Sequence, residues 1–155
     1  MQSENPQVGE RPSVWRDLIA GLSPSAVFAE PATERALGDA ERALGQPLPA
    51  RLVGLLRETN GVSGDYGLGL VWSVETIVED NLAFRRNEDF PRLYMPFDPL
   101  LFFGDAGNGD QFALLCPPLD RDDVFAWDHE SDDRKWVAAN LEMYLRWWIS
   151  GQLKL

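Results

Sequence analysis

The sequence contains one cysteine, Cys116, so no disulfide can form within the chain. A lone cysteine is typical of proteins in reducing compartments. Long apolar segments are also missing, because the longest runs, 100–103 and 112–116, have four or five residues and a membrane-spanning helix needs about 20. The polar first residues contain neither the basic start nor the apolar stretch of a secretory signal. We therefore expect a cytoplasmic protein with no membrane partner.

Basic residues are scarce: 14 Lys and Arg face 25 Asp and Glu, which gives a formal net charge of −11. Because Lys and Arg supply most of the affinity for phosphate backbones, this balance argues against direct binding to DNA or RNA. The imbalance is uneven, since residues 1–57 contain seven acids and six bases, whereas residues 58–155 contain eighteen acids and eight bases. Such a field would attract a basic partner, although net charge also serves solubility alone.

The chain has 155 residues, of which 45% are apolar and 25% charged. This length is enough to bury one continuous core without metals or disulfides. Nothing repeats internally, and no segment has low complexity. We predict a mobile N-terminal segment over residues 1–12 and a single domain over residues 13–155.

Apolar residues at helical spacing, set between capping and helix-ending residues, predict helices in five segments. Thr33 and Ser73 are expected to cap the second and the fourth helix. Gly45 and the pair Asn60-Gly61 are expected to end the second and the third. The predicted helices cover residues 14–22, 34–44, 49–59, 74–82 and 136–150.

Short apolar runs bounded by turn residues predict strands. These runs lie at residues 68–72, 100–103, 111–116 and 124–127. The glycine-rich segment 104–110 is interpreted as a tight hairpin turn held by Asx hydrogen bonds, and segment 85–98 as a long connection. Together these elements predict an α+β fold in which helices pack on one predominantly antiparallel sheet.

Four motifs occur in the order and spacing of one known family. The most specific is Glu41-x-x-Leu44-Gly45-x-x-Leu48-Pro49, followed by Leu55-Leu56 and Asn60-Gly61. The others are Leu70-Val71-Trp72 with Ile77, the hairpin Phe103-Gly104-x-x-Gly107-x-Gly109-Asp110-x-Phe112, and Val124-x-x-Trp127-Asp128-His129-Glu130. From Trp15 to Gly151, except over 87–98, the chain resembles the SUKH superfamily. Its Smi/Knr-like domains occur as immunity proteins beside bacterial toxins and in a yeast cell-wall regulator.

This resemblance implies an α+β fold with helices on a sheet and a binding role without catalysis. Members of the superfamily are typically linked to nuclease or deaminase toxins. We assign a structural role to the motif residues Glu41, Gly45, Leu48, Pro49, Asn60, Gly61, Trp72, Gly104, Gly107, Gly109 and Asp110.

Acidic residues are densest near the end of the last motif, where only Arg121 opposes them. Solvated loops are one interpretation of this run, and a docking surface for a basic protein is the other. Calcium is disfavoured because the spacing matches no loop that wraps the ion. The candidate partner-binding acids are Asp120, Asp122, Asp123, Asp128, Glu130, Asp132 and Asp133.

Other kinds of site find little support. Segment 105–110 has Gly107 where an EF-hand needs an oxygen ligand, and no Gly-Lys-Ser/Thr follows it to bind phosphate. Cys116 and His129 are single copies, which leaves a zinc site or a Cys-His nucleophile poorly supplied. A carboxylate pair for glycoside hydrolysis has no signature that separates it from the many other acids. We predict no metal, no cofactor and a buried structural cysteine.

The six tryptophans most simply supply core area. Trp147 and Trp148 are adjacent, so both cannot face inward on one narrow helical stripe, and we expect Trp147 to face outward at an interface. The predicted core contains Trp15, Leu44, Leu55, Leu56, Trp72, Phe103, Phe112 and Leu141.

Our leading hypothesis is an immunity-type protein that binds a basic toxin domain, of nuclease type, and neutralises it by occlusion. The alternative is an intracellular regulatory or scaffold domain whose partner is not a toxin. A small hydrolase is a third and weaker alternative.

Overall fold

The computed structural model describes residues 14–89, 95–97, 99–116 and 121–155, so the predicted mobile segment 1–12 and Asp120 lie outside the described residues. The elements in chain order are α1 (Val14–Leu22), β1 (Val27–Phe28), α2 (Glu34–Leu44), α3 (Ala50–Leu56), β2 (Val62–Ser63), the 3-10 turn η2 (Asp65–Gly67), β3 (Gly69–Val71), α4 (Val74–Arg86), β4 (Leu100–Asp105), β5 (Gln111–Leu115), β6 (Val124–Trp127), β7 (Arg134–Ala138) and α6 (Leu141–Ser150).

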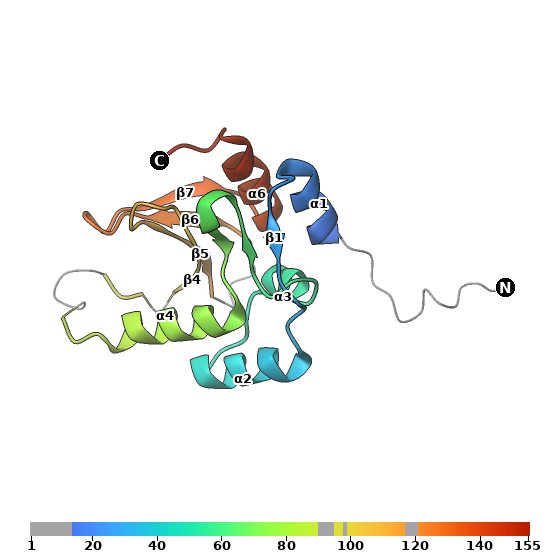
Figure 1. The fold of residues 1–155 in the computed structure, drawn as a ribbon. Coiled ribbons are helices and arrows are strands. Elements are labelled where there is room, and N and C mark those ends of the chain that lie inside the picture. The colour runs from blue at the N-terminus through green and yellow to red at the C-terminus, as the bar shows by residue number, and fades with distance from the viewer. Residues whose placement is uncertain (1–13, 90–94, 98, 117–120) are drawn as a thin grey trace.

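The strands form two antiparallel sheets, with orders β1-β2-β3 and β4-β5-β6-β7 (Figure 1). The α+β class is therefore confirmed, although the strands divide into two sheets where the sequence analysis expected one. A backbone hydrogen bond of 2.7 Å from Trp72 N–H to the Phe103 carbonyl joins β3 to β4. This bond holds the small sheet, β1-β2-β3, against β4, the edge strand of the large sheet.

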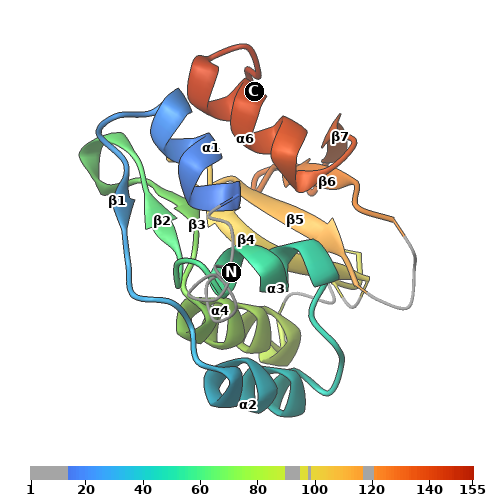
Figure 2. The ribbon, with the colours of Figure 1, turned by 90° about the vertical axis from the view of Figure 1, so that its right-hand side faces the viewer.

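Helices cover both faces of the large sheet. On one face, Tyr144 of α6 packs its ring 5.2 Å from Phe103 and 4.7 Å from Phe112. On the other, Phe84 of α4 lies 5.0 Å from the ring of Phe102 and 5.5 Å from that of Trp127. Helix α1 lies beside α6, and α2 lies against the outer side of α4 (Figure 2). None of the helices in the described part of the chain is long and apolar enough to cross a membrane.

The predicted helix caps are present. Thr33 Oγ1 accepts the Ala36 N–H at 3.0 Å, and Ser73 Oγ accepts the Thr76 N–H at 3.2 Å. Gly45 follows α2 in the left-handed conformation with φ +71°, as expected. The next helix, α3, starts after Pro49 but ends at Leu56, three residues before the predicted end.

The start of the last helix was predicted wrongly. Trp136 and Val137 belong to strand β7, and α6 begins only at Leu141, after its cap residue Asn140. Val137 and Leu141 are four residues apart, which is helical spacing, so the local pattern did not separate the strand from the helix. Strands β1 and β2 were also missed, because two residues are too few to show an alternation.

The motif residues near the helix hairpin make contacts that support a structural role. Glu41 Oε2 accepts the Leu48 N–H at 2.8 Å across the α2–α3 connection, where Leu48 and Pro49 are buried. Asn60 Oδ1 accepts the Val74 N–H at 2.8 Å at the start of α4, and its Nδ2 donates to Glu75 at 2.9 Å.

The predicted core is buried except at Trp15, which is half-buried and packs against the core edge. Leu55, Leu56, Phe103 and Phe112 are completely inaccessible. The inside of the molecule is therefore built from the apolar stripes that the sequence pattern indicated.

Gly61 and Gly45 test the structural role of the glycines, because both have positive φ but different surroundings. A Cβ on Gly61 would lie 2.7 Å from Ser73 N and 3.0 Å from Val71 O, whereas one on Gly45 would meet nothing within 4 Å. We expect Gly45→Ala to lower the free energy of unfolding by about 1–2 kcal/mol through backbone strain. Gly61→Ala adds a clash with backbone and should cost about 2–5 kcal/mol in total. Urea unfolding of both variants measures the difference; equal losses would contradict the assignment.

Candidate functional site

The acidic run surrounds the turn between β6 and β7. The turn is closed by backbone hydrogen bonds from Asp128 N–H to the Asp133 carbonyl at 2.9 Å and from Asp132 N–H to the Asp128 carbonyl at 2.8 Å. Asp132 adopts a positive φ of 63°, a conformation that Asp tolerates better than most residues. The chain forms a turn here because short polar side chains can accept hydrogen bonds from nearby backbone N–H groups.

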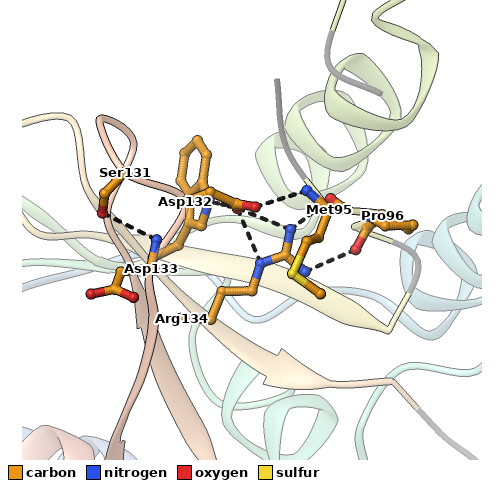
Figure 3. Close-up of polar contacts among 7 residues, drawn as sticks. Met95, Pro96, Ser131, Asp132, Asp133 and Arg134 are labelled. Carbon is orange, nitrogen blue, oxygen red and sulfur yellow. Dashed lines mark hydrogen bonds and ion pairs between the residues drawn. The ribbon is translucent and has the colours of Figure 1, made fainter. Parts of the chain in front are cut away.

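Asp132 and Arg134 are used inside the protein (Figure 3). The Asp132 carboxylate accepts hydrogen bonds from Met95 N–H at 2.7 Å, from the Trp127 indole at 2.8 Å and from Arg134 at 3.0 Å. Arg134 also donates to the carbonyls of Met95 and Pro96. Burial alone would raise the pKa of Asp132, but these hydrogen bonds and the Arg134 charge hold it below its usual value. Asp132 is therefore a structural anchor, with a side chain 12% exposed.

Arg134 completes this anchor through its guanidinium, which lies 5.0 Å from the ring centroid of Phe97. Phe97 in turn packs on Phe102 and Trp127 in the core. The pair with Asp132 thus fastens segment 95–97 to the β6–β7 turn, a function that the sequence analysis did not foresee.

Two more of the candidate acids have cationic partners. Asp122 accepts from Arg51 of α3 at 3.0 Å, and Asp123 accepts from Arg121 at 2.6 Å. The Asp123 side chain is only 14% exposed. The two arginines partly neutralise these carboxylates, so they offer less negative charge to a binding partner than a count of acids along the sequence indicates.

The exposed acids of the turn are Glu130 and Asp133. In Figure 3 the Asp133 carboxylate points away from Arg134. Asp128 is half-exposed, and the hydrogen bond that it accepts from Glu130 N–H lowers its pKa, so it stays charged. These three carboxylates remain available at the surface.

The exposed tryptophan is Trp136, half of whose surface is accessible. It pairs across the strands with the half-buried Phe125 of β6. Trp147, the expected outward residue, is only half-exposed and packs against the core edge, as does Trp148, whose ring lies 5.0 Å from that of Phe112. Trp136 was not among the candidate residues, because its apolar neighbours fit the pattern of the last helix.

His129 connects the β6–β7 turn to the glycine-rich β4–β5 turn. Its Nδ1 lies 2.7 Å from Asp110 Oδ1, and its N–H donates to the same oxygen at 3.1 Å. The β4–β5 turn has the predicted Asx hydrogen bond, from Asp110 N–H to Asn108. Asp110, Asp128 and His129 place ligand atoms within 4.8 Å of one another, a set that could hold a metal ion. Because His129 is hydrogen-bonded to Asp110, we assign it a structural role in which it joins the two turns.

Cys116 is buried, as predicted, and accepts a hydrogen bond from Gln46 Nε2 at 2.9 Å. It follows the end of β5, whereas His129 contacts Asp110 before the start of that strand. The strand therefore separates the two residues, which excludes a Cys-His nucleophilic pair.

A hollow of about 410 Å³, which we call the acidic hollow, opens beside the small sheet. Asp80 of α4 and Asp105 at the end of β4 both line it, together with Trp72. Asp105 accepts the Trp72 indole N–H at 2.8 Å. Burial and the nearby charges of Asp105 and Glu79 raise the pKa of Asp80. This pair leaves no signal in the sequence, because the two acids lie in separate elements 25 residues apart.

Comparison with known proteins identifies the family. The model of the SMI1/KNR4 family (SUKH-1) matches residues 31–147, three quarters of the chain. The chain belongs to the SMI1/KNR4 family. Domains of this family are generally non-catalytic and include immunity proteins that bind toxin partners. No curated protein matches the chain. The family match covers the β6–β7 turn and both carboxylates of the acidic hollow, Asp80 and Asp105.

Asp132 and Asp133 are neighbours, but their substitution should affect stability to very different extents. Asp132→Ala removes the acceptor of three groups and should lower the free energy of unfolding by about 1–3 kcal/mol. Asp133→Ala removes an exposed side chain and should change it by less than about 0.5 kcal/mol. Urea unfolding compares the two variants, and a neutral Asp132→Ala would refute the anchoring role.

The His129 contact should make stability depend on pH. The hydrogen bond with Asp110 raises the pKa of His129 above its usual value of 6.5. Protonated His129 therefore stabilises the folded state fully below about pH 6.5, and this contribution disappears as the pH rises through the folded-state pKa. The difference in unfolding free energy between the native protein and His129→Gln should be larger at pH 6 than at pH 9. A constant difference would contradict this linkage.

Proposed function

We propose that this protein is a non-catalytic, immunity-type binding protein of the cytoplasm, which occludes the functional site of a basic, nuclease-type toxin domain. The observation that carries the proposal is membership of the SMI1/KNR4 family, which includes immunity proteins. The net charge of −11 supports a basic partner. Lys and Arg supply most of the affinity of proteins for phosphate backbones, so a nuclease-type toxin would present a basic surface that suits the acids found here.

We assign docking to the β6–β7 surface, which consists of Phe125, Asp128, Glu130, Asp133 and Trp136. Trp136 is its exposed aromatic residue and lies three positions after Asp133 on the same hairpin. The carboxylates lie in the adjoining turn. This arrangement supports an interface with an aromatic centre and an acidic rim. Asp120 stays a candidate from its sequence position alone, whereas Asp122, Asp123 and Asp132 are already paired.

The two parts of this surface would contribute differently to binding. A tryptophan that becomes desolvated at the centre of an interface commonly carries a large share of the binding energy. Exposed rim carboxylates mainly raise the rate of association, and salt weakens that effect. We therefore expect the acids to affect the rate of association and Trp136 to affect the rate of dissociation.

The test uses surface plasmon resonance at two ionic strengths, with the product of the neighbouring gene as the candidate toxin domain. Glu130→Gln/Asp133→Asn should slow association about threefold or more at low salt and flatten its salt dependence. Trp136→Ala should leave association nearly unchanged and speed dissociation about 30-fold, the equivalent of about 2 kcal/mol.

The matched control is Asp17→Asn/Glu30→Gln, which removes the same charge from exposed positions outside this surface. If the control and the test variant slowed association equally, the local surface would be refuted in favour of net charge. If the native protein failed to bind that domain, the immunity role would be refuted and a regulatory or scaffold role would take its place.

A further inference from the structure

The acidic hollow combines negative charge with enough space for a side chain from another molecule. It lies between β3, the first turns of α4 and the end of β4, and it holds about 410 Å³. Gly69 forms part of its lining. A Cβ on this residue would come 3.0 Å from the Trp72 ring and 3.2 Å from Asp105 Oδ2. A side chain at this position would therefore crowd the Asp105 carboxylate and the buried Trp72 indole, and glycine leaves the space beside the carboxylate open.

The two carboxylates of the hollow, Asp80 and Asp105, have no cationic partner among the residues that the structure describes. This differs from the β6–β7 turn, where Asp132 forms an ion pair with Arg134. Like charges that share a site disfavour each other's ionised form, and the pKa of Asp80 is raised first by burial and then by the charges of Asp105 and Glu79. A cation that entered the hollow would relieve this repulsion.

We propose that the acidic hollow receives the guanidinium of an arginine side chain from a basic protein partner. A guanidinium is planar and carries five N–H donors, so it can bond two carboxylates at once, whereas an ammonium is a compact point charge. The inference rests on the proposed function only for the basic character of the partner. Its residues are separate from those of the β6–β7 surface.

The test uses no toxin. The intact ¹⁵N-labelled protein is titrated with the peptide acetyl-Gly-Arg-Gly-amide, with the citrulline peptide as the uncharged match and the lysine peptide as the cationic match. The readout is the indole N–H signal of Trp72, assigned with Trp72→Phe, because that group donates to Asp105. The arginine peptide should shift this signal saturably, the lysine peptide should bind more weakly, and the citrulline peptide should have no effect.

Substitutions then locate the site. Asp80→Asn and Asp105→Asn should each weaken the apparent affinity at least about fivefold, between the effects expected for exposed and buried charge pairs. Asp105→Asn keeps an oxygen acceptor for the indole. Asp39→Asn, an equal change of charge on exposed α2, should leave the affinity unchanged.

No saturable shift with the arginine peptide, or equal shifts with arginine and citrulline, would overturn the proposal. Equal binding of arginine and lysine would overturn the guanidinium assignment, and equal weakening by Asp39→Asn would reduce the effect to net charge. Because the peptide replaces the toxin, failure here leaves the β6–β7 surface untouched. Failure of toxin binding likewise leaves this result standing.

Discussion

The close approach of β3 to β4 is the constraint on which the rest of the structure depends. A Cβ on Gly104 would lie 2.5 Å from the carbonyl oxygen of Leu70, so only a residue without a side chain fits there. The same carbonyl accepts the buried hydroxyl of Tyr144 at 2.8 Å. Burial and the Asp105 charge raise the Tyr144 pKa well above its usual value, so the hydroxyl remains a donor. One carbonyl thereby connects the small sheet, the large sheet and α6.

The opposite face of this junction is held by a buried asparagine. Asn81 of α4 donates to the Phe102 carbonyl and accepts the Phe102 N–H, both at 2.9 Å. These bonds satisfy the backbone of β4 where its register with β5 shifts, between Phe102 and Gly104. Because Asn81 sets the position of α4 against β4, it also brings Asp80 next to the end of that strand. The acidic hollow is thus a consequence of how the two sheets meet.

Acids that are close in sequence and acids that are close in space form different groups in this protein. The run from Asp122 to Asp133 looks like one patch of charge, yet Asp122, Asp123 and Asp132 are paired with arginines. Asp80 and Asp105 lie far apart in the sequence and share one hollow. The charge count along the chain therefore locates the acidic half of the protein but does not show which of its acids have arginine partners.

The sequence alone determined the features that depend on neighbouring residues. Thr33 and Ser73 cap helices through bonds to N–H groups three positions away, and the β4–β5 turn follows from local glycines and Asx bonds. The apolar stripes likewise identified the core, and the ordered motifs identified the family.

Only the tertiary structure decided which distant groups meet. Asp132 bonds Met95, 37 residues away, and Tyr144 bonds Leu70, 74 residues away. Trp136 could not be separated from the last helix, because its apolar neighbours fit a helical pattern until the pairing of β7 with β6 placed them in a strand. Capping and turn formation act over a few residues, and their signals stay in the local sequence. Partners of buried charges and exposed aromatic residues are chosen by strand pairing and helix packing, which no short window of sequence contains.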